Sequence, residues 1–509
     1  MQTIEIDSKS SSQIIQMLLL RSESRQLEFK RVSGKMVGKA LETICAFSNS
    51  LGGYLVLGLA DLKEHQGKSR LFGIEENPEA VDDLQRMLLT DFAPEINGLV
   101  LRRLSCRIAN GPQKNKAGHV LMLWVPASEG VHSIVHRGTY TRMDAGNRML
   151  SAQEVTELSY RRGVRSATAE PVAVDLKLLH TETWEKYIQT RGPLSGMFAD
   201  QLLRIGLADD VGDQVVQPKR AAVLLFAHEP GSLLAAHDGR ADVRVMIYDG
   251  KQVSSGATPN LRRAAKTIRG ALIDQIDRTV RVVLDELSQG LTLSASGFKT
   301  VHAYPERVVK EAIVNAIIHR DYRLNRDIFI RIFDDRIEVE NPGTLPGNIT
   351  PVTIAWAGSK ARNPLLAANL REFAQAPNID AGEGVRTMFS EMAHANLYPP
   401  QYRQSLDVAV PTVTVTLFNA KRPSTWDEVS DWLDRRGSIA NADMVRISHV
   451  DTLKASKMLK AWKDQGLLVP LPGREKRNMA YAKPNAQQSE LSFLSEDGDK
   501  KSLRTKNPI

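Results

Sequence analysis

The clearest periodic stretch of the chain runs from Val308 to Asp321, where apolar residues recur at helical spacing and predict a buried helix face. A second set of positions in this stretch is polar. Glu311, Asn315 and His319 lie four residues apart and therefore form one stripe along the same helix. A carboxylate, a carboxamide and an imidazole in a row are unusual beside an apolar face. The stripe predicts a site for a hydrated metal ion and phosphate groups.

The pattern before this helix predicts two regions joined by a linker. Residues 1–165 mix helix and strand periods, beginning with a short helix and a strand near 26–30. Small polar residues and a proline at 166–171 predict the linker. Residues 172–300 predict an α/β connecting region. Its buried strands are expected at 221–227 and 243–248, and its long helix at 261–287.

The third region, residues 301–420, contains the stripe and several turns that follow it. Two strands flank Asp334-Asp335, which indicates a hairpin, and the second strand runs into Asn341-Pro342-Gly343. Further along, Arg362-Asn363-Pro364 begins a predicted helix and Gly382-Glu383-Gly384 precedes another. Glycines ahead of a helix N-terminus let backbone amides approach phosphate closely, and the helix dipole favours an anion there.

The fourth region, residues 424–484, is small and mostly helical, and residues 485–509 predict a disordered tail. The second helix of residues 424–484 is expected to bury Leu453, Leu459 and Trp462. The opposite side of that helix and the following hairpin tip are basic, through Lys454, Lys457, Lys460, Arg474, Lys476 and Arg477. This order resembles winged helix-turn-helix domains, in which the second helix enters the major groove and the wing touches the backbone. A winged helix used for protein contacts or dimerisation is the alternative.

The composition is that of a multidomain globular protein without a disulfide framework or a membrane span. The chain has 509 residues, a net charge of +8 and ordinary apolar and charged fractions, which is compatible with several domains and with a nucleic-acid or other polyanionic partner. Its two cysteines, Cys45 and Cys106, exclude a disulfide framework and predict buried free thiols. No apolar run approaches the length of a membrane span, so we expect a soluble, cytoplasmic protein with no membrane partner.

The third region resembles the Bergerat-type ATPase fold of gyrase, histidine kinases and mismatch-repair ATPases, in which a helix carries Glu-x-x-x-Asn. The resemblance implies that Asn315 coordinates Mg²⁺ with ATP and that Glu311 activates the hydrolytic water. It also implies nucleotide contacts by His319, Asn341, Gly343, Gly382 and Gly384. The usual Asp-x-Gly box is replaced by Asn341-Pro342-Gly343, whose carboxamide oxygen can still accept a bond from adenine. The motifs EAIVNAIIHRDY, ENPGTLP, RNPLLA and GEGVRTM resemble more closely a RecG-like bacterial subgroup. A degenerate ATPase fold that serves only as a scaffold is the alternative.

The first region resembles the Schlafen core, or divergent AlbA-like domain, through ESRQLEFK, AFSNSLGGYLVLGLAD and HRGTYTRMDAGN. Some Schlafen proteins are RNases with three acidic residues. The resemblance implies that Glu23, Glu28 and Asp61 bind Mg²⁺ or Mn²⁺ for phosphodiester cleavage. Solvated carboxylates at strand ends are the alternative. Lys30 and Arg31 would contact phosphate.

Together these patterns predict an α+β multidomain protein with a Schlafen-like domain, a Bergerat-type α/β sandwich and a small winged helix. The expected function is a bacterial regulator, oligomeric as a dimer or larger, in which ATP and Mg²⁺ control binding of DNA or RNA. The alternative functions are an ATP-gated, metal-dependent nuclease and a structural assembly protein that binds neither ligand.

Overall fold

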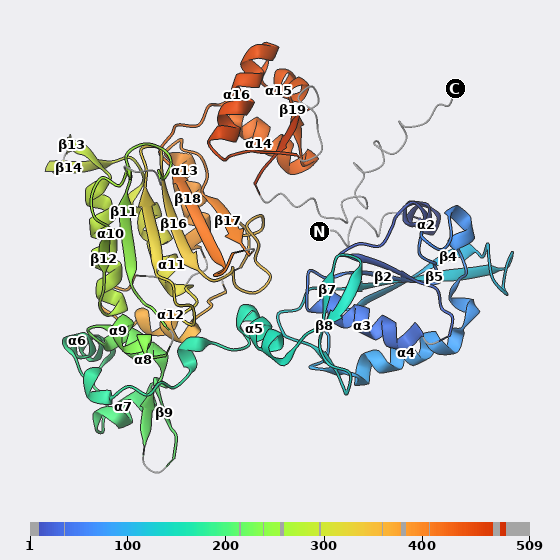
Figure 1. The fold of residues 1–509 in the computed structure, drawn as a ribbon, viewed down its shortest axis with the longest axis horizontal. Helices are drawn as coiled ribbons and strands as arrows, with labels where there is room; N and C mark the ends of the chain where they lie inside the picture. Colours follow the sequence, from blue (N-terminus) through green and yellow to red (C-terminus); the bar gives the residue numbers. More distant parts are fainter. Residues whose placement is uncertain are drawn as a thin grey trace. The chain divides into compact units, whose positions relative to one another are not determined.

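The computed structural model describes residues 10–34, 36–212, 215–237, 239–254, 259–294, 297–358, 360–377, 383–406, 408–471 and 479–484, with the side chains of 289–302 excepted. The chain divides into two compact units, the first ending at Val164 and the second beginning at Arg165 (Figure 1). Each unit is described by itself. Among the described helices, none combines the length and the apolar character needed to cross a membrane.

A four-stranded sheet forms the centre of the first unit, in the order β1 (Leu27–Lys30), β2 (Gly53–Leu57), β5 (Ala117–Val125) and β4 (Val100–Arg107). β1 and β2 run parallel, and the other neighbours run antiparallel. Because strand side chains alternate between faces, one face packs on helix α2 (Ser11–Leu19) and the other on α3 (Met36–Ser48) and α4 (Pro78–Thr90) (Figure 1). The sheet is therefore covered on both sides.

Short elements complete this unit, and its thiols are free. A pair of two-residue strands, a hairpin and a final helix follow the sheet: β3 (Phe92–Ala93), β6 (Ser133–Ile134), β7 (Tyr140–Met143), β8 (Gly146–Met149) and α5 (Ala152–Arg162). Helix α4 was not anticipated from the sequence. Cys45 is buried, as expected, whereas Cys106 is only partly buried.

A six-stranded sheet forms the centre of the second unit, in the order β12 (Lys266–Ile268), β11 (Val243–Ile247), β15 (Ile328–Ile332), β16 (Arg336–Pro342), β18 (Thr412–Phe418) and β17 (Gln401–Ser405). Only β11 and β15 pair in parallel. Helix α11 (Glu306–Ile318) packs against β16 and lies between α10 (Leu272–Glu286) and α13 (Gly384–His394) (Figure 1). The expected division at residue 300 therefore runs through a single sheet.

Two expected elements of residues 172–300 are wrong. Residues 221–227 form helix α8 (Arg220–Phe226) and not a strand. All seven of its residues are buried, and a short run that is apolar on every side has no period by which to distinguish a buried helix from a buried strand. The long helix expected from 261 begins only at Leu272, because β12 pairs with β11 and Gly270, with a φ of +118°, ends that strand segment.

The remaining elements of the second unit's first part are short. The other short elements of the second unit are α6 (Glu182–Arg191), α7 (Phe198–Arg204), β9 (Ala208–Asp210), β10 (Val216–Pro218), α9 (Pro230–Ala235), β13 (Ser288–Ser294), β14 (Gly297–His302) and α12 (Pro364–Leu370). Near α6 and α8 lies an aromatic cluster in which Trp184, Tyr187 and Phe226 contact one another, and Phe373 contacts Tyr187.

Three helices and a small sheet follow β18: α14 (Thr425–Arg436), β19 (Ile439–Ala440), α15 (Asn441–Ser448), α16 (Thr452–Asp464), β20 (Val469–Pro470) and β21 (Ala480–Ala482). The strands pair in the order β19-β21-β20. Asp451 caps α16 by accepting a hydrogen bond from the Lys454 amide at 2.8 Å. Leu459 and Trp462 are buried as expected, but Leu453 is 66% exposed because it lies on the opposite side of the helix from Ala455 and Leu459.

The fully buried Arg70 side chain links the end of α2 to the segment that follows β2. Its Nε donates to the carbonyl of Ala60 at 2.7 Å, and one terminal nitrogen donates to the carbonyls of Leu18, Leu19 and Arg21 at 2.9–3.1 Å. Last-turn carbonyls of a helix have no partner within the helix, so this guanidinium supplies donors that the backbone lacks.

We expect Arg70→Met to lower the free energy of unfolding by about 3 kcal/mol, because buried carbonyl oxygens would lose their donors. Lys68→Met is a matched control on the same short segment; its side chain is exposed, and we expect a change below about 0.5 kcal/mol. Urea denaturation of the full chain measures both values. An unchanged midpoint for Arg70→Met would show that the guanidinium is dispensable.

Candidate functional site

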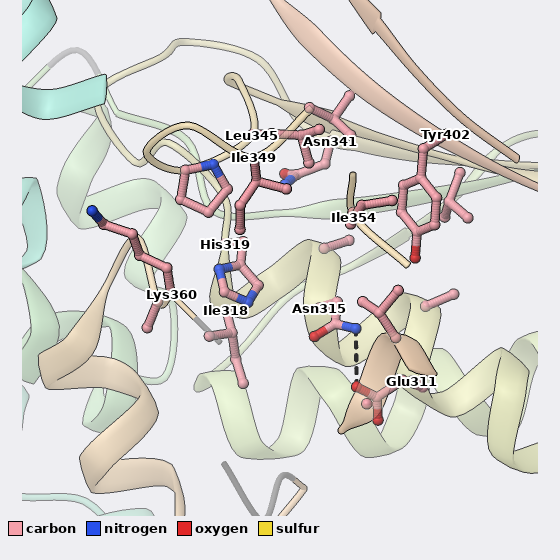
Figure 2. Close-up of a pocket in the computed structure, with 18 of the residues that line it drawn as sticks. Glu311, Asn315, Ile318, His319, Asn341, Leu345, Ile349, Ile354, Lys360 and Tyr402 are labelled. Carbon is pink, nitrogen blue, oxygen red and sulfur yellow. Dashed lines mark hydrogen bonds between the residues drawn. The ribbon is translucent and has the colours of Figure 1, made fainter. Parts of the chain in front are cut away.

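A cavity of about 380 Å³ lies between α11, the sheet and the N-terminus of α13 (Figure 2). Strands β16, β17 and β18 supply Val339, Tyr402 and Val415 to its wall, and the segment between β16 and α12 supplies Leu345 and Ile349. This volume lies in the range of small-molecule and cofactor sites, and mostly apolar walls with a few polar groups are typical of them.

The polar stripe of α11 faces this cavity. Glu311, Asn315 and His319 all line it, and Asn315 Nδ2 donates to Glu311 Oε1 at 2.9 Å (Figure 2). That bond turns the carboxamide so that its Oδ1 is left without a partner among the described residues, and a carboxamide oxygen is a ligand that Mg²⁺ accepts. Burial raises the pKa of Glu311, although the bond from Asn315 opposes the shift. A carboxylate with a raised pKa is better matched to general-base work near neutral pH.

The cavity also contains an unsatisfied polar atom on the sheet side. Asn341 Oδ1 is buried without a hydrogen-bond partner in the described structure, and the apolar side chains of Val413 and Leu345 lie beside it in the cavity wall. Figure 2 shows Asn341 across the cavity from Asn315. A buried acceptor is costly unless a donor reaches it, so this atom is suited to an amino group of a flat, partly apolar ligand.

Gly384, the first residue of α13, lies directly against Glu311. A Cβ added at this position would be 1.7 Å from Glu311 Oε1, so a larger residue here would require the Glu311 carboxylate to move. The helix N-terminus and the stripe therefore meet at one end of the cavity, where the helix dipole favours an anion. Gly382 lies outside the described residues.

Gly343 has a different position from the one the ATPase resemblance implies. It is not among the described residues that line the cavity. Its amide donates to the carbonyl of Pro411 at 2.8 Å, and its Cα lies against Asp321, where a Cβ would meet that side chain at 3.0 Å. Its φ of +118° requires glycine for the turn after β16.

Four cations that the sequence analysis did not single out also line the cavity: Arg307, Lys310, Lys360 and Arg386. Two carboxylates, Glu311 and Glu383, oppose them. The positive excess suits a polyanionic group such as a triphosphate. Arg307 precedes Glu311 by four residues, so helical spacing could have identified it as part of the same stripe.

The neighbouring His-Arg-Asp and Arg-Asn-Pro triplets hold the backbone in place. Arg320 is fully buried and donates to the carbonyls of Asp242 and Arg326 at 3.2 and 2.6 Å. Asp321 pairs with Arg323 at 2.7 Å and Arg362 at 3.5 Å; burial alone would raise its pKa, but these cations hold it below the usual value. Arg320 and Asp321 thus form local hydrogen bonds and ion pairs, while His319 faces the cavity.

The three acidic residues of the first unit differ in their surroundings, and Glu28 is the one that forms ion pairs in the described structure. Glu28 is 5% exposed, and its two oxygens contact Lys30 and Arg142, each at 2.6 Å. Glu23 accepts from the Phe29 amide at 3.1 Å, and Asp61 has one buried oxygen without a partner. Across the described ranges no group of three His, Cys, Asp or Glu side chains could hold a metal ion. The arrangement therefore does not fit the implied metal site.

The basic residues expected to contact nucleic acid differ in their availability. Lys30 forms an ion pair with Glu28. Arg31 forms a bidentate ion pair with Glu76, and its guanidinium lies over the Phe72 ring. Lys454, Lys457 and Lys460 of α16 are all exposed. Arg474, Lys476 and Arg477 lie outside the described residues.

Comparison with known proteins identifies two domains in the chain. A family model described as "Putative ATP-dependent DNA helicase recG C-terminal" matches residues 325–416, and one described as "Schlafen, AlbA_2" matches residues 23–151. The chain contains a Schlafen/AlbA_2 domain and a RecG-like ATPase domain. Both resemblances are thereby confirmed, and the second domain implies ATP as a ligand. The ATPase match begins after α11, so the stripe lies outside the matched range.

No curated protein matches the chain. The solved structure of the DIP2311 protein from Corynebacterium diphtheriae is 18% identical, covers 95% of this chain and 98% of that chain, and has a TM-score of 0.39. That score is too low to carry an argument about this fold.

The acidic cluster generates a pH prediction. Burial, followed by the charges of Glu28 and Asp61, raises the pKa of Glu23 to about 7. Between the ordinary value of 4.5 and about 7, the folded state binds this proton more tightly than the unfolded state, so stability falls as pH rises through that window. Glu23→Gln keeps an acceptor for the Phe29 amide but removes the titration. We expect urea denaturation to show this variant gaining stability relative to the wild type between pH 5 and pH 8, and a pH-independent difference would contradict the raised pKa.

Proposed function

We propose that the protein is a nucleic-acid-binding regulator whose ATPase domain binds ATP with Mg²⁺ and thereby controls nucleic-acid binding by its flanking domains. The observation that carries the proposal is the opposition, across one cavity, of the Glu311–Asn315 pair and the unpartnered Asn341 oxygen. These groups suit the two ends of a nucleotide. The apolar wall between them suits its base, and the surrounding cations suit its phosphates.

The residues fit the implied group by their donor chemistry. Asn315 would hold Mg²⁺ through Oδ1, Arg307 and Lys310 would attract the phosphates, and Asn341 would accept from the base amino group. Bound Mg²⁺ would supply charge neutralisation for the triphosphate. Glu311, hydrogen-bonded to Asn315 and held by burial at a raised pKa, would orient and deprotonate a water.

A connection from the cavity to the C-terminal helices supports the switching role. Helix α13 begins against Glu311 and ends at His394, and Leu397 then pairs with Lys421 just after β18. The next residue, Tyr398, is buried in the core of the C-terminal helices, where its hydroxyl accepts from Trp462 Nε1 at 2.9 Å. A displacement of α13 on nucleotide binding would therefore act directly on that core.

The order of elements from α14 to β21 supports a winged helix in this position. Helix α16 is the second long helix of this winged helix. The exposed lysines of α16 would contact nucleic-acid phosphates without reading bases. Nucleotide-dependent association of two or more chains is part of the proposal by analogy with other ATPases of this fold. Light scattering with and without ATP tests it.

We favour a regulator over the alternative nuclease because Glu28, one of the three acidic residues, is already paired with two cations. A metal ion would have to displace both Lys30 and Arg142 from Glu28 before that carboxylate could act as a ligand. Incubating the full chain with RNA and with single-stranded and duplex DNA, in Mg²⁺ or Mn²⁺, separates the two functions. Cleavage that is lost in Glu28→Ala would favour the nuclease.

We expect Asn315→Ala to abolish ATP binding in titration calorimetry with Mg²⁺, because the metal ligand and the Glu311 contact are both lost. Glu311→Gln is the matched comparison at the other end of the same hydrogen bond. It should bind ATP within about tenfold of the wild-type affinity but lose hydrolysis by at least about a hundredfold. Unchanged ATP affinity in Asn315→Ala would refute the site assignment.

We expect Tyr398→Ala to uncouple the two sites. ATP affinity should stay within about threefold, because Tyr398 does not line the cavity, while the effect of ATP on nucleic-acid affinity should disappear. Tyr398→Phe is the conservative control; it loses only the hydroxyl bonded to Trp462 and should retain most of the coupling. Fluorescence anisotropy with labelled DNA or RNA, with and without ATP, measures the ratio. A ratio in Tyr398→Ala equal to that of the wild type would exclude this route.

A further inference from the structure

Asn341 places a carboxamide on an otherwise apolar wall of the nucleotide cavity. Strands β16 and β18 contribute four residues to the lining, Val339, Asn341, Val413 and Val415. Val339 lies opposite Val415 in the antiparallel register, and Asn341 lies opposite Val413. Because side chains two residues apart share a face of a strand, these four side chains form one surface on the cavity side of the sheet. A planar base would pack on the valines, and its polar edge would meet the carboxamide.

The polar groups that follow Asn341 in the chain are already engaged. The Leu345 amide donates to Gln404 Oε1 at 2.7 Å. The hydroxyl and carbonyl oxygens of Thr344 accept from Arg362 Nη2 at 3.0 and 2.6 Å. In contrast, no hydrogen bond to a described residue holds either end of the Asn341 carboxamide, and its Oδ1 is buried. Asn341 is therefore the group at this wall that a base has to satisfy.

A carboxamide can both accept and donate, whereas an ionised carboxylate only accepts. The oxygen and nitrogen of a carboxamide are similar in size, and the surrounding hydrogen bonds decide which of them points where. At Asn341 no described residue makes that choice. A half-turn of the last side-chain torsion, which has a broad energy profile, therefore exchanges Oδ1 and Nδ2 at little cost. The wall can present either an acceptor or a donor to the same point of a base.

We infer that this cavity accepts 6-oxopurine nucleoside triphosphates, those of hypoxanthine and guanine, as well as ATP. Adenine presents an amino donor at position 6, and guanine presents a carbonyl acceptor there. Asn341 Oδ1 would accept from the amino group, and after the half-turn Nδ2 would donate to the oxo group. A carboxylate at this position would accept from adenine but would repel the oxo group. The inference rests on the proposed function, and it widens the ligand from ATP to the purine nucleoside triphosphates.

Titration calorimetry of the full chain with Mg²⁺ compares ATP with inosine triphosphate, which has an oxo group at position 6 and no amino group at position 2. We expect the wild type to bind the two within about tenfold of each other, because each makes one hydrogen bond to the carboxamide. Asn315→Ala should abolish binding of inosine triphosphate as it does that of ATP. Each nucleotide should also displace the other, since both would occupy one cavity.

Asn341→Asp tests the donor, because it keeps an acceptor and nearly the same volume. We expect this variant to bind ATP within about tenfold of the wild-type affinity and to weaken inosine triphosphate by at least about another tenfold, since an oxygen replaces Nδ2. Asn348→Asp is the matched control. It adds the same charge to the segment after β16, but its side chain is exposed and is not among the described residues that line the cavity. It should change the ratio of the two affinities by less than about twofold.

The outcomes distinguish the inference from the proposed function. A wild type that binds ATP, but binds inosine triphosphate more than about tenfold more weakly, would overturn the inference and leave ATP binding intact. Retained binding of inosine triphosphate in Asn315→Ala would place that ligand elsewhere, and equal losses of both nucleotides in a folded Asn341→Asp would show that Asn341 does not read position 6; either result rejects the inference. A wild-type chain that binds neither nucleotide would refute the proposed function as well. Thermal unfolding checks each variant, and the wild-type ratio decides the inference if Asn341→Asp fails to fold.

Discussion

Helix α11 is fixed over the six-stranded sheet by burial of one face, and the position of the candidate site depends on that packing. Val308, Val309 and Ile313 are almost fully buried in the main core of the second unit. Their burial sets the rotation of the helix, and the rotation turns Glu311, Asn315 and His319 toward the cavity. At the C-terminal end, Asn363 Nδ2 donates to the carbonyls of Ile318 and Arg320 at 2.7 and 2.8 Å and fixes where the helix ends. The Arg-Asn-Pro segment thus contributes to the site by holding the helix that forms it.

Buried arginines organise the polar interior of both units. Arg70 and Arg320 donate mainly to backbone carbonyls, whereas Arg142 is 1% exposed at its side chain and bonds directly to Glu28. A buried carboxylate with such a partner is stabilised in place, and losing the partner would leave an uncompensated charge. Glu28 of the Schlafen/AlbA_2 domain is therefore part of its internal packing in this structure.

The second unit joins a ligand cavity to a helical module through a short covalent path. Tyr402 lines the cavity, and Tyr398, four residues earlier, contacts Trp426 edge-on with ring centroids 5.2 Å apart. Because packed aromatic cores do not deform gradually, a shift of α13 or β17 would change which arrangement of these rings is favoured. Helix α13 and strand β17 connect the cavity to this aromatic core directly along the chain.

Much of the site followed from the sequence, because helical periodicity alone places Glu311, Asn315 and His319 on one stripe. The hairpin after it and the helix starts near Pro364 and Gly384 were also predicted, since proline and glycine constrain the backbone locally. The sequence did not determine that β11 joins β15, that residues 220–226 are helical, or that Leu453 faces solvent. It also did not determine that Lys30 and Arg142 neutralise Glu28 or that Gly343 lies away from the cavity. Local conformational preference is written into a few neighbouring residues, whereas strand partners, ion pairs and cavity walls depend on residues far apart in the chain, which only the tertiary structure brings together.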